Sequence, residues 1–158
     1  MKLYIKQKVF SWKDRFTVWD EQGRERYYAE GELFSWGKKL RLTDADGNET
    51  AYIEQEVLRW RPRFHVFIGG EEVAEIVKYG FLHPSYAIEG PGWTAEGSFL
   101  EHYYTVTEAN DRIVAEIHKQ WMTWGDCYEI DVYDDRDELL ALTTVLVIDC
   151  VMAMQSNN

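Results

Sequence analysis

A chain of 158 residues with 46% hydrophobic and 28% charged residues has the balance of one globular domain, which excludes a disordered or fibrous protein. Its net charge of −11 repels phosphate backbones and disfavours general nucleic-acid binding. The N-terminus has no apolar run of roughly 7–15 residues, as a secretory signal would need. We therefore expect a single cytoplasmic domain over residues 1–158, with Cys127 and Cys150 as buried, reduced thiols.

Short runs rich in β-branched and aromatic residues fill the chain up to residue 132, and no convincing amphipathic helix interrupts them. Alternation of apolar and polar residues in such runs is typical of half-buried β-strands. The twelve runs cover residues 4–10, 16–19, 26–29, 39–43, 50–53, 64–68, 72–77, 86–88, 93–95, 104–106, 113–117 and 128–132.

The segments between these runs have the chemistry of tight turns. Residues 20–23 and 44–47 begin with Asp and end with Gly, as hairpin turns built on a type I turn prefer, and Gly69-Gly70 suits a two-residue hairpin. Residues 108–111 form a looser equivalent. These turns predict consecutive antiparallel hairpins.

A spacing of 13 residues recurs along the strand region. It separates Gly23 from Trp36, Gly47 from Trp60 and Asp111 from Trp124, and Phe10-Ser11-Trp12 resembles the ending of these units. The period predicts a turn-plus-strand unit that is used several times around a closed sheet.

Residues 139–154 are apolar on every side of a helical wheel, and Asp149 is their only charge. Such a helix must be buried in a protein core or in a membrane. At ~1.5 Å per residue it is roughly 24 Å long, short of the ~30 Å hydrocarbon core, so we favour a protein core over a tail anchor and expect no transmembrane segment. Asp135 and Glu138 fit a capping box at its start.

Together these elements predict a mainly β fold: a closed antiparallel β-barrel of about twelve strands around a central hydrophobic C-terminal α-helix. Eight strands leave an interior that side chains just fill, so a central helix requires a larger barrel. Because the helix occupies the interior, any ligand must bind the outer wall or one end of the barrel.

Several segments resemble the LURP-one-related family. They are residues 6–8, 16–18 followed by 20–23, 34–40, 44–49 through 53–56, and the helix with Ile148-Asp149. The resemblance implies the fold shared by the C-terminal domain of tubby proteins and by phospholipid scramblases, a twelve-stranded barrel threaded by a hydrophobic helix. It implies no defined biochemical activity.

Six basic residues are candidates for binding an anionic headgroup: Lys38, Lys39, Arg41, Arg59, Arg61 and Arg63. Tubby-like domains hold phosphoinositide headgroups on the barrel exterior, and the resemblance implies this class of site without matching individual residues. The alternative is that these residues lie on solvated strand faces and pair with the many Asp and Glu side chains.

Other constellations have simpler structural interpretations. The acids at positions 131, 134, 135, 137 and 138 suggest calcium by analogy with scramblases, but they lack the EF-hand pattern and suit a helix N-terminus. Asp149 is expected to tie the helix to the barrel wall. The four histidines share no metal-ligand spacing, so we expect no metal, cofactor or catalytic residue.

The sequence therefore favours a monomeric, non-catalytic binding module that recognises phospholipid headgroups or a membrane surface through the barrel exterior. The alternative is a protein-interaction or scaffold domain that uses exposed aromatics such as Trp19, Trp93 or Trp121.

Overall fold

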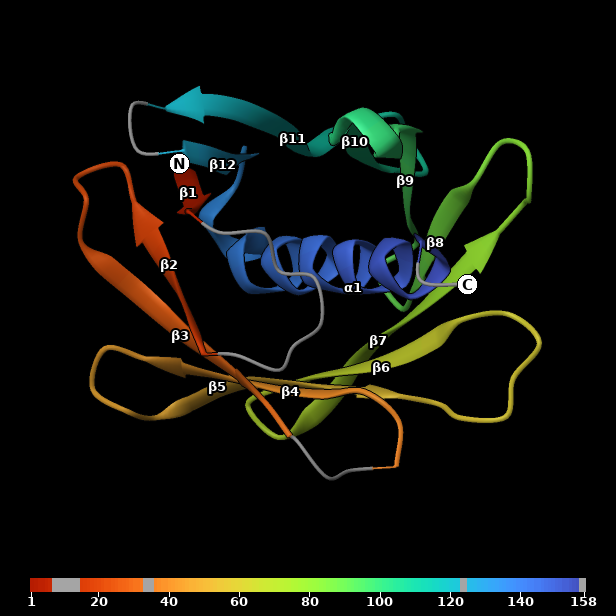
Figure 1. Ribbon diagram of the computed structural model, residues 1–158, viewed down its shortest axis with the longest axis horizontal. Coiled ribbons are helices and arrows are strands. Elements are labelled where there is room, and N and C mark those ends of the chain that lie inside the picture. The colour runs from red at the N-terminus through yellow and green to blue at the C-terminus, as the bar shows by residue number, and fades with distance from the viewer. Residues whose placement is uncertain (7–14, 33–35, 123–124, 157–158) are drawn as a thin grey trace.

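A computed structural model describes residues 1–6, 15–32, 36–122 and 125–156, with the backbone alone at residues 121, 122, 125 and 126. Twelve antiparallel strands form a closed barrel around a helix (Figure 1). They are β1 (Lys2–Ile5), β2 (Phe16–Asp20), β3 (Glu25–Gly31), β4 (Lys39–Asp44), β5 (Glu49–Gln55), β6 (Arg63–Ile68), β7 (Glu71–Tyr79), β8 (Ser85–Glu89), β9 (Trp93–Ser98), β10 (Tyr103–Glu108), β11 (Ile113–Met122) and β12 (Gly125–Val132).

Each strand pairs with its neighbours in the sequence, and β1 pairs with β12 to close the barrel, with Leu3 opposite Ile130. The alternation that predicted the strands is also the pattern of burial. On β2, Phe16 and Val18 face the core while Thr17 and Trp19 are half-buried. The predicted twelve-stranded barrel is confirmed, although the part of the first run beyond residue 6 lies outside the described residues.

The predicted turns form as their residues require. The Gly23 N–H donates to the Asp20 carbonyl over 3.0 Å, and Gly23 has φ +73°, which favours glycine. The Asp20 carboxylate accepts hydrogen bonds from the backbone N–H groups of Gln22 and Arg24. The β4–β5 turn repeats this arrangement around Asp44.

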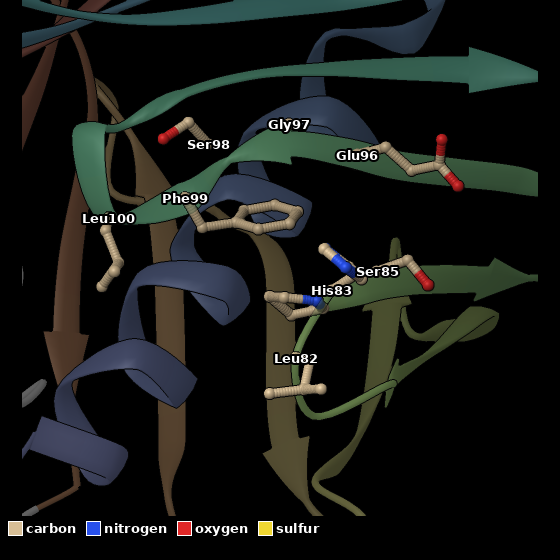
Figure 2. A pocket seen from close by; sticks show the side chains of 9 residues that line it. Leu82, His83, Ser85, Glu96, Gly97, Ser98, Phe99 and Leu100 are labelled. Atoms are coloured by element: carbon tan, nitrogen blue, oxygen red, sulfur yellow. The ribbon is translucent and has the colours of Figure 1, made fainter.

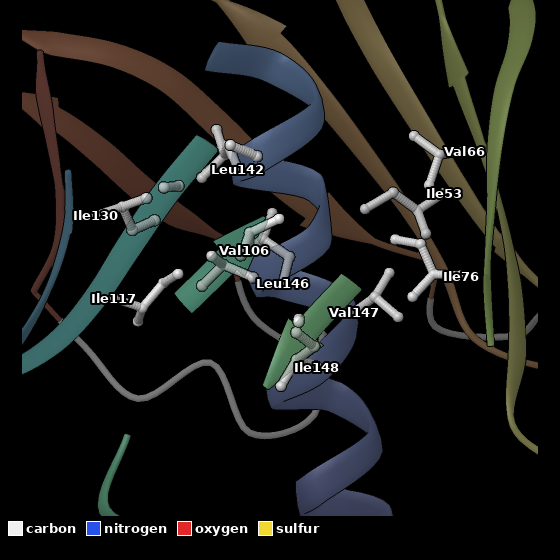
Figure 3. Close-up of a cluster of buried hydrophobic side chains, with 14 of the residues drawn as sticks. Ile53, Val66, Ile76, Val106, Ile117, Ile130, Leu142, Leu146, Val147 and Ile148 are labelled. Atoms are coloured by element: carbon white, nitrogen blue, oxygen red, sulfur yellow. The ribbon is translucent and has the colours of Figure 1, made fainter. Parts of the chain in front are cut away.

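Helix α1 (Glu138–Ser156) lies inside the barrel. Leu142, Leu146 and Ile148 point toward one side of the wall, and Val147 points toward Ile76 on the other (Figure 3). By length and composition α1 is apolar enough to cross a membrane. The helix is buried among the barrel side chains, so its apolar composition is that of a core helix.

The start of the helix differs from the predicted capping box. A 3-10 turn, η2 (Asp135–Asp137), precedes α1, and Asp134 is its N-cap, accepting from the Arg136 N–H over 3.0 Å. The Glu138 carboxylate does not reach back to the turn but binds the barrel wall, 2.8 Å from Arg26 Nη2 and 2.9 Å from Tyr27 Oη. The prediction for Asp135 and Glu138 was therefore wrong, because partners on β3 outcompete the local backbone.

Because consecutive strands are antiparallel neighbours, their connections alternate between the two ends of the barrel. The turns after β2, β4, β6, β8 and β10, and the passage from β12 into α1, lie at one end, which we call the turn end. The connections after β3, β5, β7 and β9 lie at the other, the loop end. The C-terminus of α1 reaches the connections after β5 and β7 on the right of Figure 1.

Candidate functional site

The most exposed apolar side chains of the described chain all lie at the loop end. Six large hydrophobic side chains at this end have exposed fractions from 76% to 100%. All six belong to connections between strands. We call this set the loop rim. It consists of Trp36, Leu58, Trp60, Phe81, Leu82 and Leu100.

The connections that carry the loop rim contact one another in order around the barrel. Between the first two, the Lys38 N–H donates to Gln55 Oε1 over 3.0 Å, and a Cβ at Gly37 would lie 2.6 Å from Val57 Cγ1. Trp60 and Phe81 then line a shallow pocket of about 300 Å³ together with Gln155 at the end of α1. The apolar tips therefore lie on connections that follow one another around this end of the barrel.

A second, wider pocket of about 450 Å³ joins the last two connections of the loop rim (Figure 2). Leu82 and His83 lie on one side of it, and Ser98 to Leu100 lie on the other. Phe99 is buried, with its ring centroid 5.0 Å from that of Tyr86 and 4.9 Å from that of Tyr104. This anchor holds η1 (Phe99–Glu101) against the core while the next side chain, Leu100, projects into solvent.

Leu58 adopts a backbone conformation that its side chain disfavours. Its φ is +60°, in the left-handed region, where a residue with a Cβ has a higher energy than glycine by roughly 1–2 kcal/mol. Its side chain is exposed, so packing in the free protein does not offset this strain. Strained positions that packing does not explain are often functional.

The six predicted basic residues do not form one patch. On the outer wall, Lys39 pairs with Glu54 over 3.6 Å, and Arg41 pairs with Glu49 over 2.9 Å and with Glu32 over 3.1 Å. These two side chains follow the alternative prediction, in which solvated strand faces carry paired charges.

Arg63 is also on the wall and pairs with Glu75. Lys38, Arg59 and Arg61 lie beside the loop rim instead. Arg59 pairs with Glu56, whereas Arg61 stacks on the Tyr79 ring with its guanidinium carbon 4.7 Å from the centroid. Among the described residues, no carboxylate forms an ion pair with Lys38 or Arg61, so both charges are available to an anionic surface.

Charge differs sharply between the two barrel ends. Counted together with the strand residue on either side, each of the six turn-end connections carries more acidic than basic residues, and the β4–β5 turn has Asp44, Asp46 and Glu49 with no base. The predicted acidic segment before α1 belongs to this end, and three of its five carboxylates pair with arginines. Asp134 pairs with Arg136, and Asp137 lies 3.0 Å from Arg112.

The buried acid and thiols of the described residues are held in the core. Asp149 is 6% exposed and accepts a hydrogen bond of 3.1 Å from the hydroxyl of Tyr128 on β12. Both cysteines are buried and free of disulfides. Burial raises the pKa of the Cys150 thiol to about 12, so its reactive thiolate is scarce at neutral pH.

The aromatic surface predicted for a protein partner is not where the sequence placed it. Trp93 is buried, at 4% exposure, in the core, and Trp19 is half-buried beside Lys6, whose Nζ lies 4.1 Å from the ring centroid. The side chain of Trp121 is outside the described residues.

The family described as LURP-one-related matches residues 1–149. The chain belongs to this family. A LURP-one-related relative in Bacillus subtilis (strain 168), named uncharacterized protein YxjI, is 32% identical over 153 residues, covering 96% of this chain and 94% of the relative. The predicted family resemblance is confirmed.

The X-ray structure of a protein from Arabidopsis thaliana has the same fold as this LURP-one-related chain. The two align with a TM-score of 0.62 and 18% identity, over 92% of this chain and 88% of the plant protein. At this identity the likeness concerns the fold alone.

Sequence reasoning missed most of the loop rim, although one signal pointed to it. The 13-residue spacing from Gly23 to Trp36 and from Gly47 to Trp60 spans one strand. It therefore starts in a turn at the turn end and finishes in a connection at the loop end. Trp12 and Trp124, which share the pattern, lie outside the described residues.

Proposed function

We propose that this LURP-one-related protein is a non-catalytic module that docks on anionic membrane surfaces through its loop end. The distribution of exposed apolar side chains carries the proposal. All six loop-rim residues project from one barrel end, while the other end is acidic. A monomeric soluble protein rarely exposes a contiguous apolar edge unless that edge binds something.

Charge favours a membrane over other apolar partners. Lys38 and Arg61 lie among the apolar tips without carboxylate partners in the described chain, and Lys78 lies beside them with its Nζ 2.5 Å from Gln155 Oε1. Each basic residue near an anionic bilayer contributes about 1 kcal/mol, and Trp, Phe and Leu insert about 5–10 Å into the headgroup boundary. Repulsion of the acidic turn end would orient the loop end toward the bilayer.

Vesicle co-sedimentation tests the proposal. Wild-type protein is expected to bind vesicles that contain phosphatidylserine, to bind neutral phosphatidylcholine vesicles more weakly, and to lose affinity as salt rises. Replacing both Trp60 and Phe81 by Ala should weaken binding at least tenfold. Tyr133→Ala, which removes an exposed aromatic at the turn end, is the matched control and should bind as wild type.

The electrostatic part has its own pair of variants. Lys38→Glu with Arg61→Glu should abolish the preference for anionic vesicles, whereas Arg41→Glu on the outer wall should leave it unchanged. Absence of binding to anionic vesicles at low salt would overturn the proposal. If the Trp60 and Phe81 variant instead loses a purified protein partner and the wild type ignores vesicles, the loop rim is a protein-interaction surface.

A further inference from the structure

A histidine on the outer wall is surrounded by carboxylates. His65 on β6 has its Nδ1 atom 2.5 Å from Glu72 Oε1 and 3.7 Å from Glu75 Oε1, both on β7. One ligand-type atom from each of the three residues lies within 4.8 Å of the other two. The His65 Nε2 atom is 3.2 Å from the Glu56 carboxylate on the opposite side of the ring.

A β-bulge creates this convergence. His65 pairs with Glu75 and Val66 with Ala74, but Phe67 pairs with Glu72, so Val73 is an extra residue on β7. In a regular strand, residues 72 and 75 would point to opposite faces. The bulge turns Glu72 onto the outer face beside Glu75, an effect for which bulges near functional sites are known.

The surrounding residues orient the cluster as a second ligand shell would. The Glu56 carboxylate lies 3.2 Å from Nε2 of His65, within reach of a hydrogen bond from Nε2–H, and Nδ1 faces Glu72 and Glu75. Metal-binding histidines commonly donate their other ring N–H to a carboxylate in this way. Arg63 binds Oε2 of Glu75, and Glu75 Oε1 is the oxygen that lies toward His65.

A cation must sit between these groups, because a bare Nδ1 lone pair 2.5 Å from a carboxylate oxygen is repulsive. A proton on the ring satisfies this requirement, and so does a metal ion. We propose that His65, Glu72 and Glu75 bind a divalent transition metal of the zinc class, through Nδ1 and one oxygen of each carboxylate. A fourth position stays open to water.

The donor set selects this class of ion. One imidazole nitrogen with two carboxylates suits zinc, whose ligands at about 2.0–2.2 Å lie roughly 3–4 Å from one another. The flexible side chains of Glu72 and Glu75 reach that spacing with small rotations from the distances seen. Calcium prefers six to eight oxygen ligands, and magnesium a nearly octahedral oxygen shell, which three residues with one nitrogen do not provide.

Zinc titration against a chromophoric chelator tests the site, with the full chain first dialysed against EDTA. One equivalent of zinc is expected to bind, and calcium or magnesium at a hundredfold excess should not displace it. His65→Gln and Glu72→Gln should each weaken zinc affinity at least tenfold. Glu71→Gln, which changes the adjacent exposed residue on β7, is the matched control and should bind within twofold of wild type.

A second readout separates ligation from folding defects. Zinc should raise the Tm of wild type and of Glu71→Gln, but not that of His65→Gln or Glu72→Gln. The site is refuted if the wild type binds no zinc, since a protonated His65 then accounts for the geometry. It is equally refuted if His65→Gln and Glu72→Gln bind zinc as tightly as wild type. None of these residues belongs to the loop rim, so vesicle binding does not affect the outcome.

Discussion

The hydroxyl of Tyr128 on β12 donates a hydrogen bond to the Asp149 carboxylate on α1, with 3.1 Å between Oη and Oδ1. It links the barrel wall to the only charged side chain in the apolar run 139–154. Both residues are buried, so the bond forms where water is largely absent. Asp149 therefore ties the second half of the helix to β12.

Tyr128→Phe is expected to lower the free energy of unfolding by about 1–3 kcal/mol, because a buried carboxylate loses a donor while the ring keeps its packing. Urea denaturation followed by tryptophan fluorescence measures the change. Tyr133→Phe, which removes an exposed hydroxyl, should differ from wild type by less than about 0.5 kcal/mol. Equal stability of Tyr128→Phe and wild type would remove the structural role of the bond.

Glu138 ties the start of the same helix to β3, and Glu138→Gln is expected to destabilise the fold by about 1–3 kcal/mol. The amide keeps the shape but loses the charge that binds Arg26 and Tyr27. Arg26 is partly exposed, which limits the loss. Asp135→Asn, a change three residues earlier, should leave the free energy of unfolding nearly unchanged in urea denaturation. A larger loss of stability for Asp135→Asn than for Glu138→Gln would favour the capping box.

Leu58→Gly is expected to leave stability unchanged or raise it by up to about 1 kcal/mol, because glycine adopts φ +60° without strain. The same substitution removes an exposed apolar side chain from the loop rim and should weaken vesicle binding several-fold. Differential scanning calorimetry and co-sedimentation on one protein sample measure both quantities. A variant that is less stable yet binds normally would contradict the functional interpretation of the strain.

Asp134 makes the fold sensitive to acid. Hydrogen bonds from the side chain and the backbone N–H of Arg136 lower the pKa of Asp134 from 3.8 to about 2. A carboxyl with a lowered folded pKa stabilises the native state above its unfolded pKa, and this contribution is lost as pH falls from about 4 to about 2. Asp134→Asn should flatten the dependence of Tm on pH in that window. An unchanged slope would show that the pairing contributes nothing.

Much of this fold follows from local pattern. Alternation placed the strands, Asp20 and Asp44 marked the turns, and the unbroken apolar run around Asp149 identified the core helix. These features depend on residues close in sequence, which a single chain displays directly. Tyr128, the donor to Asp149, lies on β12 and outside the helix, so local pattern did not identify it.

The candidate sites depend on register, which local pattern does not give. Arg41 and Arg63 were expected to bind a ligand, but both pair with glutamates on neighbouring strands. Those partners are set by the pairing of the strands, which the sequence alone does not show. Glu138 was assigned to a cap because Arg26 is distant in sequence. His65 was set aside for lack of ligand spacing, since Glu72 joins it only through the extra residue at Val73.

The pairing of β1 with β12 has a consequence for the order of events during synthesis. The first strand cannot find its partner, and the barrel cannot be filled, until the ribosome has made β12 and then α1. Until then the inward faces of the strands already made have no helix to cover them, which invites chaperones or aggregation. Closure of the barrel is therefore expected to be a late and slow step of folding, because β1 and β12 lie far apart in the sequence.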